Sequence, residues 1–367
     1  GEYATLMHLP MAYILPIFML GFMTRFFGKN KSWAEGFRAW KYCLMASTCF
    51  VVPYLILAWT VGPELPSMVG GLLGLGVLVY LTRKGFCIPR DEVWQFAPTA
   101  EWDHDWSGEI KASDATDFTD HMSQTRAWMP YVLCGLILVL TRVPAFGLKP
   151  LINTYGVVGV SNVLGQEGVG ASLALLNLPG TIPFILVSII TIGLHAMSPA
   201  KVSGAWTTAF KKMKAPTIAL ISAVALVSVF KGSGVNADGL PSMPMAMAQF
   251  VANLTGNAWP YFASYAGGLG AFITGSCTVS DMLFGNFQWD VANALNFSPL
   301  GHYVILAAQA VGGAMGNMIC IHNIVAVCAV LGMIGHEGTI LRRTVIPFIL
   351  YSIPVGLVAG YLIASGI

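Results

Sequence analysis

Long runs of apolar residues dominate this chain and constrain what it can fold into. A helix needs about 20 apolar residues to cross a bilayer, and most of the runs approach or reach that length. They cover residues 8–27, 42–61, 68–81, 128–143, 181–197, 216–230 and 344–363. Hydrophobic residues make up 56% of the 367 residues and charged residues only 10%, unlike the mix of a soluble domain. The sequence therefore predicts an all-α polytopic membrane protein.

Lysine and arginine predict the orientation of these spans. Sixteen of the 19 basic residues fall in alternate loops: Arg25, Lys29, Lys31, Arg38, Lys41, Arg83, Lys84, Arg90, Lys111, Arg126, Lys201, Lys211, Lys212, Lys214, Arg342 and Arg343. The positive-inside rule places such loops in the cytoplasm. The run over 216–230 then ends outside and the last run begins inside, so an odd number of crossings must separate them.

Two further apolar stretches are each interrupted by a short polar, glycine-flanked break, at 274–281 and at 316–323. The number of crossings is odd if 257–295 forms a re-entrant hairpin entered from outside and 303–334 forms a discontinuous helix that crosses once. Three crossings also satisfy parity, but they place the first break in a water-facing loop. We expect one transmembrane domain over 1–367, with about eight crossings and one hairpin. Residues 241–255 are expected to form a helix near the outer interface.

Residues 84–127 are expected to form an acidic cytoplasmic loop. The segment carries nine acidic residues, among which Asp103, His104 and Asp105 are consecutive. A solvated loop explains this charge better than a metal site does, because no second histidine stands at ligand spacing. We expect no cofactor and no nucleic-acid partner.

The two breaks point to a binding site. Non-helical backbone at membrane depth is tolerated only where it lines a cavity or packs in protein, and matched breaks mark transporter sites. A helix that begins there presents free N–H groups and a positive dipole end to an anion. The hydroxyl, amide and backbone donors at the breaks suit a small carboxylate with its own hydroxyl. They suit a phosphate or dicarboxylate less well, because those ligands favour a guanidinium clamp. The expected substrate-binding residues are Gly275, Ser276, Cys277, Thr278, Ser280, Asn317 and Asn323.

Two titratable residues in the breaks, Asp281 and His322, are candidates for coupling substrate movement to a proton. Alternatives stay open: Asp281 could cap the returning helix, and His322 could be a packed histidine. Arg142 could snorkel to the interface or attract the anion. The glycine clusters at 267–270 and 312–316 are expected to permit close helix packing.

Several segments resemble the L-lactate permease family in order and spacing along essentially the whole chain. They cover residues 62–67, 126–130, 179–184, 272–276 and 312–320. The resemblance implies a proton-coupled, multi-pass carrier of the bacterial inner membrane for L-lactate, D-lactate or glycolate. It also implies kinship with the ion-transporter superfamily, in which inverted repeats each contribute a hairpin and a discontinuous helix.

The chain departs from that family pattern in two respects. The family's hairpin tip usually carries Asn or Asp where this chain has Cys277, and Asn where it has Asp281. Family members are also longer at the amino end, so we expect a first repeat, absent here, to complete the site.

Other functions remain as alternatives. A sodium-coupled carboxylate carrier or an arsenite-type exporter is the nearest. A membrane enzyme with histidine-bound metal and a structural subunit fit the breaks less well. Assembly into a homo-oligomer stays open.

Overall fold

The computed structural model describes residues 1–63, 65–89, 96–98, 101–102, 122–143, 146–160, 171–178, 180–211, 213, 229, 232–331, 333 and 335–366. The chain forms two compact units. Unit 1 comprises Gly1–Val52, Leu73–Ala115 and Pro216–Ile367, and unit 2 comprises Pro53–Leu72 and Thr116–Ala215. Nearly all of the expected run at 216–230 and most of the expected acidic loop at 84–127 lie outside the described residues.

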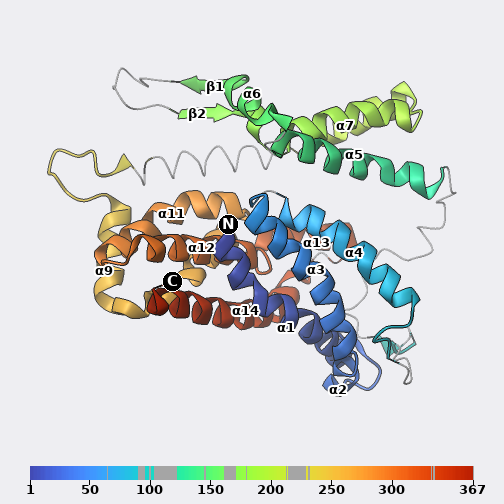
Figure 1. The fold of residues 1–367 in the computed structure, drawn as a ribbon, viewed down its shortest axis with the longest axis horizontal. Helices are drawn as coiled ribbons and strands as arrows, with labels where there is room; N and C mark the ends of the chain where they lie inside the picture. The colour runs from blue at the N-terminus through green and yellow to red at the C-terminus, as the bar shows by residue number, and fades with distance from the viewer. Residues whose placement is uncertain are drawn as a thin grey trace. The chain divides into compact units, whose positions relative to one another are not determined.

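Unit 1 is a helical bundle. Its helices include α1 (Glu2–Phe27), α2 (Trp33–Phe37), α9 (Met243–Thr255), the 3-10 helix η6 (Gly256–Tyr261), α10 (Ala263–Thr274), α11 (Cys277–Ala294), α12 (Pro299–Gly316), α13 (Ile321–Leu331) and α14 (Glu337–Ser365). Helix α12 lies among α1, α10, α11 and α14 and is largely buried. Figure 1 shows α11, α12 and α14 running side by side. The helix predicted at 241–255 is present as α9, which packs against α11.

Local sequence signals fix where the helices of this bundle begin. Ser298 caps α12 by accepting a hydrogen bond from the Gly301 N–H, and Pro299 occupies the first helical position. Proline is suited to that position because its fixed φ is helical and a missing N–H is harmless there. Ser242 caps α9 in the same way, with Pro244 in the first turn. The cap at Ser298 sets where α12, the helix that precedes the second break, begins.

Glycines allow α10 and α12 to pack backbone to backbone. A Cβ atom added to Gly312 would clash with the carbonyl oxygen of Ser264. One added to Gly267 would clash with the carbonyl of Gln309, and one added to Gly316 with the carbonyl of Gly268. Small residues at a helix interface permit such close approach. The prediction of close packing at both glycine clusters is confirmed.

Unit 2 contains α5 (Gln124–Arg142), α6 (Leu148–Thr154), the strands β1 (Val157–Val160) and β2 (Ala171–Ala174), the 3-10 helix η5 (Leu175–Asn177), α7 (Thr181–Leu194) and helical residues 199–211. The strands pair antiparallel, with Val157 opposite Ala174. The all-α prediction missed this small ribbon. Its physical basis is local: β-branched valines favour extended backbone, and Gly156 turns the chain with φ 73° just before β1.

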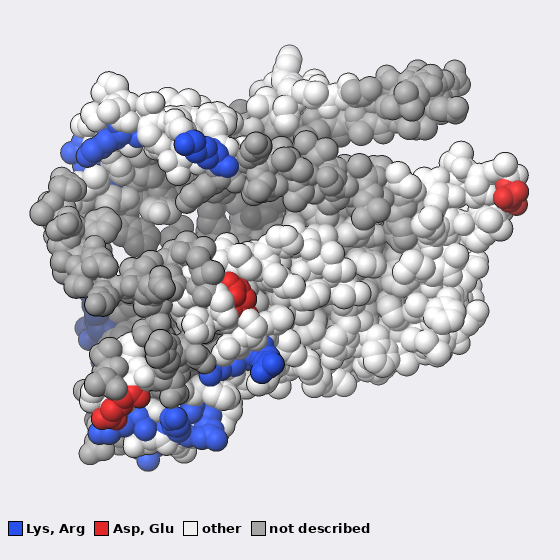
Figure 2. All heavy atoms as spheres, turned by 180° about the vertical axis from the view of Figure 1, so that it is seen from behind, with Lys and Arg blue, Asp and Glu red and all other residues white. Residues whose placement is uncertain are grey.

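Two more helices, α3 (Trp40–Thr60) and α4 (Pro66–Arg83), divide their residues between the two units. Within the described residues, five helical segments are long and apolar enough to cross a membrane: Glu2–Phe27, Trp40–Thr60, Pro66–Arg83, Pro299–Cys328 and Glu337–Ser365. Most of the described surface visible in Figure 2 is white, that is, without Lys, Arg, Asp or Glu. The chain is a helical membrane protein, whereas the crossing count and the re-entrant hairpin stay predictions.

Candidate functional site

The first break separates α10 from α11. Helix α10 ends at Thr274, and Gly275 follows with φ 72°, a left-handed conformation that a side chain disfavours. Ser276 is the N-cap of α11, and its Oγ accepts a hydrogen bond from the Val279 N–H at 3.3 Å. The predicted interruption of helical pairing is confirmed. The alternative that Asp281 caps the helix is wrong, because Ser276 does so.

The second break separates α12 from α13. Helix α12 ends at Gly316 and α13 begins at Ile321. Between them the backbone hydrogen bonds span three residues instead of four. The Met318 N–H donates to the Met315 carbonyl at 3.1 Å, and the Ile319 N–H donates to the Gly316 carbonyl at 3.2 Å. These shorter-range hydrogen bonds end the α-helical ladder. Helical pairing is thus interrupted between Gly316 and Ile321, whereas a discontinuous helix that crosses the membrane over 303–334 stays a prediction.

The structure brings the two breaks into contact. A Cβ atom added to Gly275 would lie 3.2 Å from Cys320 Sγ and 3.6 Å from His322 Cβ. The Asn317 Nδ2 donates to Cys277 Sγ at 2.8 Å, which links the end of α12 to the start of α11. The two turns therefore lie against each other within unit 1.

Amide side chains also connect residues within the second break. Asn323 Nδ2 donates to Asn317 Oδ1 at 3.1 Å. Asn317 Nδ2 also donates to the carbonyl of Gly313 at 3.2 Å. The two asparagines named from the sequence are thus neighbours. Together they join the first turn of α13 to the last turn of α12.

Unpaired backbone donors point from both helix starts. Within the described part of the chain, no hydrogen-bond partner is found for the N–H groups of Cys277, Thr278, Ile321, His322 or Asn323. These are first-turn groups, which have no partner within their own helix. The positive dipole ends of α11 and α13 meet here. The side chains of Thr278, His322 and Asn323 are exposed, so solvent or a ligand can reach this corner.

Ser280 and Asp281 lie behind the tip rather than in it. The Ser280 side chain is fully buried; its hydroxyl donates to the Gly267 carbonyl at 2.7 Å and accepts from Gln309 Nε2 at 3.1 Å. That hydroxyl is occupied by helix packing, so we leave Ser280 out of the proposed substrate contacts. Asp281 is partly buried, and its Oδ1 lies 3.4 Å from Gln309 Nε2.

Sequence reasoning missed the polar residues that support the site. Gln309 lies within α12, and its side chain is 1% exposed. Its Oε1 accepts from Gln288 Nε2 at 3.0 Å, and Gln288 Oε1 accepts from the Trp259 indole N–H at 2.9 Å. An isolated glutamine in the apolar run that precedes the second break was the available signal. Polar residues inside membrane segments face protein or cavities and find partners there.

In unit 2, Arg142 turns inward. Its side chain is buried and donates to Asn177 Oδ1 at 2.8 Å and to the Asn177 carbonyl. The arginine therefore packs within the unit instead of reaching outward to an interface. This bonding joins the end of α5 to η5.

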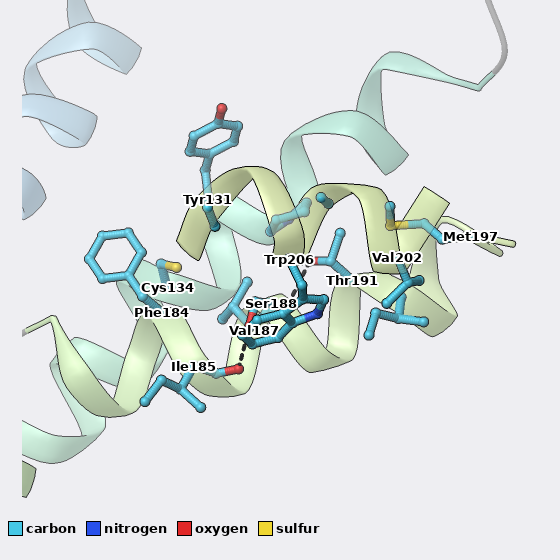
Figure 3. Close-up of a pocket in the computed structure, with 14 residues that line it drawn as sticks. Tyr131, Cys134, Phe184, Ile185, Val187, Ser188, Thr191, Met197, Val202 and Trp206 are labelled. Atoms are coloured by element: carbon cyan, nitrogen blue, oxygen red, sulfur yellow. Dashed lines mark hydrogen bonds between the residues drawn. The ribbon is translucent and has the colours of Figure 1, made fainter. Parts of the chain in front are cut away.

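Unit 2 also contains a cavity of about 510 Å³ between α5, α7 and residues 199–211. Figure 3 shows Phe184, Tyr131 and Trp206 among its lining residues. Its serine and threonine hydroxyls are turned to their own helix: Ser188 donates to the Ile185 carbonyl and Thr191 to the Val187 carbonyl. The cavity is apolar and does not suit a carboxylate.

Comparison with known proteins identifies the family. The sequence model of the family described as L-lactate permease matches residues 1–364. The chain belongs to the L-lactate permease family. Family members are permeases, that is, membrane transporters rather than enzymes. The family resemblance predicted from the sequence motifs is confirmed.

Individual relatives agree with this family assignment. The chain is 32% identical over 332 residues to a provisionally named L-lactate permease of Haemophilus influenzae, covering 85% of the chain and 57% of the relative. It is 24% identical to the L-lactate permease of Bacillus subtilis, over 91% of the chain and 60% of the relative. It is 25% identical to the glycolate permease GlcA of Escherichia coli, over 95% of the chain and 62% of the relative.

The chain spans about three fifths of the length of the curated relatives it matches. No solved structure shows a significant match to it.

Proposed function

We propose that this protein is a secondary transporter that moves L-lactate or a related small 2-hydroxy monocarboxylate, together with a proton, across the bacterial inner membrane. The observation that carries the proposal is the contact between the two breaks, which places the start of α11 beside the start of α13. The names of the relatives, L-lactate permease and glycolate permease, support the same substrate class.

The carboxylate of the substrate binds at the two helix starts. The N–H groups of Cys277 and Thr278 approach from α11, and those of His322 and Asn323 from α13. Backbone donors at a helix start bind an anion without a lysine or arginine, because the dipole adds to the hydrogen bonds. Gly275 lets the two helix starts come close together, because a side chain there would press against Cys320.

The substrate hydroxyl is recognised by amides and a hydroxyl at the rim. Asn323 and Thr278 are exposed at this corner, and the Asn323 side chain is held by Asn317. An amide both donates and accepts, which matches a hydroxyl that does the same. A site built to hydrogen-bond a hydroxyl discriminates against analogues that lack it. Lactate and glycolate are therefore preferred over propionate and acetate.

A proton travels with the anion through Asp281 or His322. Moving one charge across a membrane potential involves about 2.3 kcal/mol per 100 mV, so a lone anion enters a negative interior with difficulty. A proton taken up by the protein makes the transported pair neutral. His322 is exposed at the site, and Asp281 lies one turn along α11 from Cys277.

The proposal is tested with the protein expressed from its complete coding sequence and reconstituted into vesicles. We expect uptake of labelled lactate and glycolate, but not succinate, when the outside is made acidic. We expect Asp281→Asn or His322→Gln to abolish lactate-driven proton entry, measured with a pH-sensitive dye inside the vesicles.

Matched gradients separate the alternatives. A sodium gradient at equal pH should give no uptake if the coupling ion is a proton. Sodium-driven uptake without proton entry would show that the coupling ion is sodium and not a proton. Unchanged coupling in both single variants would reject the roles of Asp281 and His322, and absence of carboxylate uptake under either gradient would reject the transporter proposal.

A further inference from the structure

A continuous chain of buried polar groups runs through the apolar core of unit 1 to Asp281. It consists of Trp259, Gln288, Gln309, Ser280 and Asp281, and we refer to it as the amide chain. The side chains of Gln288, Gln309 and Ser280 are 0%, 1% and 0% exposed. Around it lie buried apolar residues of α11, α12 and α14, such as Val291, Val311 and Val355. Polar groups at such a place require partners, and each step of the chain supplies one.

The direction of every hydrogen bond in the amide chain follows from its first member. An indole N–H can only donate, so the atom of Gln288 that lies 2.9 Å from Trp259 Nε1 must be the amide oxygen. The Gln288 amide nitrogen then donates to the Ala263 carbonyl at 2.8 Å and to Gln309 Oε1 at 3.0 Å. Both assignments agree, because a carbonyl can only accept.

Gln309 is oriented in turn by Gln288. With its oxygen facing Gln288, its amide nitrogen must face α11, where it lies 3.1 Å from Ser280 Oγ and 3.4 Å from Asp281 Oδ1. The amide chain therefore ends in an N–H group presented to a carboxyl. A donor at that position stabilises the ionised carboxylate more than the protonated acid.

Asp281 is the ionisable carboxyl at the end of the amide chain, and few other ionisable groups face it. Among the described residues of the elements packed on α11, α9 has no charged or histidine side chain. On α10, Tyr265 packs against Phe348. On α12, His302 lies seven residues before Gln309, roughly 10 Å along the helix, and bonds Asn293 and the Ser298 carbonyl.

Three further ionisable groups of the described residues lie along α11 or at the second break. Cys277 precedes Asp281 by one turn on α11, and Asp290 follows nine residues later, roughly 13 Å along the same helix. His322, on α13, lies at the other break. None of these groups belongs to the amide chain. The hydrogen-bond donor that the chain presents to Asp281 is the neutral amide of Gln309.

We propose that Gln309 is a positioning residue that sets the proton affinity of Asp281 during transport, with Trp259 and Gln288 fixing which way its amide points. This inference deepens the proposed function and rests on the role given there to Asp281. Gln309 fixes the pH range in which the carrier loads and releases its proton. Ser280, bonded to both Gln309 and the Gly267 carbonyl, keeps the start of α11 in register with α12.

The test compares Gln309→Met with the unmodified protein expressed from its complete coding sequence. Methionine preserves the length of the side chain and removes the donor. Without that N–H the carboxylate is less stabilised, so Asp281 holds its proton to higher pH. We expect the pH midpoint of lactate uptake to rise by at least about half a pH unit, a threefold change in proton affinity.

A second variant acts at a distance from Asp281. Trp259→Phe removes the indole donor and leaves a smaller aromatic ring, so only the Ala263 carbonyl still fixes the orientation of the two glutamines. We expect a smaller rise in the same midpoint. Because Trp259 does not contact Asp281, a purely local packing defect at the carboxyl would not reproduce it. This variant also carries the test if Gln309→Met does not fold.

The control is Ser352→Ala in α14. Ser352 is also fully buried, and its hydroxyl donates to the Phe348 carbonyl outside the amide chain. We expect it to leave the pH midpoint unchanged.

A readout independent of transport separates this inference from the proposed function. A hydrophobic carbodiimide modifies protonated carboxyls, and mass spectrometry reports the fraction of Asp281 modified at each pH. We expect the labelling midpoint to rise in Gln309→Met and Trp259→Phe, with Asp281→Asn as the blank. A shifted midpoint in a protein that transports no carboxylate would support the amide chain and reject the transporter. Unshifted labelling in both variants would overturn the role of Gln309.

Discussion

Asn323 Nδ2 lies 3.1 Å from Asn317 Oδ1, so an amide in the first turn of α13 holds the C-cap residue of α12. Asn317 in turn donates to Cys277 Sγ at 2.8 Å. Through these two hydrogen bonds, Asn317 links the second break to the first. The shape of the site therefore depends on side-chain amides as well as on the free backbone.

Replacing Asn323 by Ala should weaken substrate binding. The change removes the donor to Asn317 and an amide at the rim of the site. A neutral hydrogen bond contributes about 0.5–1.5 kcal/mol, so we expect a roughly three- to tenfold rise in the KM for lactate. Asn253→Ala is the matched control, because Asn253 is exposed on α9, a helix that borders neither break. Equal KM values for the two variants would contradict a role for Asn323.

Ser276 and Thr278 should respond differently to loss of their hydroxyls. Ser276→Ala removes the N-cap of α11, which we expect to lower the free energy of unfolding by about 1 kcal/mol. Thr278→Val keeps the shape of an exposed side chain and should leave stability unchanged while raising the KM for lactate. Thermal unfolding and uptake on the same preparations measure both effects. A stability loss in Thr278→Val as large as that in Ser276→Ala would refute this division of roles.

The glycines of α12 and α11 should differ sharply in their tolerance of a methyl group. Gly312→Ala would force a Cβ against the Ser264 carbonyl, so we expect poor expression or a strongly lowered unfolding temperature. Gly285→Ala meets nothing within 4 Å, and alanine favours helix by about 0.5–1 kcal/mol, so we expect equal or higher stability. Fluorescence-detected gel filtration after a heating series compares the two. Equal loss in both would show that the α10–α12 contact tolerates a methyl group.

The sequence alone could predict the breaks because their signals are local. Gly275 and Ser276 carry a left-handed turn and an N-cap, and such residues act within a few positions of themselves. The glycine clusters likewise predict a close helix contact, although they do not show which helix is the partner. These features required no knowledge of how distant segments pack.

The amide chain could not be predicted in the same way. Trp259, Gln288 and Gln309 are separated by more than 20 residues at each step, and only packing of α11, α12 and η6 brings them together. The burial of Ser280 is likewise a consequence of tertiary contact, since its position in the break suggested an available hydroxyl. The β1–β2 ribbon was missed because two short strands give a weak pattern among long apolar helices.

Substrate should protect Cys277 from alkylation. Its thiol is partly buried at the start of α11 and accepts a hydrogen bond from Asn317, so a carboxylate held by the adjacent N–H groups would cover it. We expect saturating lactate to slow modification by N-ethylmaleimide several-fold, with propionate, which lacks the hydroxyl, less effective. Mass spectrometry of the peptide that contains Cys277 gives the rate.

Cys87 provides the internal control for this experiment, because it is an exposed thiol in a loop after α4, distant in sequence from both breaks. Its modification should proceed at the same rate with and without lactate. Slowing at both cysteines would indicate an effect of lactate on the reagent or on the whole protein. Slowing at neither, at a lactate concentration that saturates uptake, would place the substrate away from the start of α11 and remove the main support for the site.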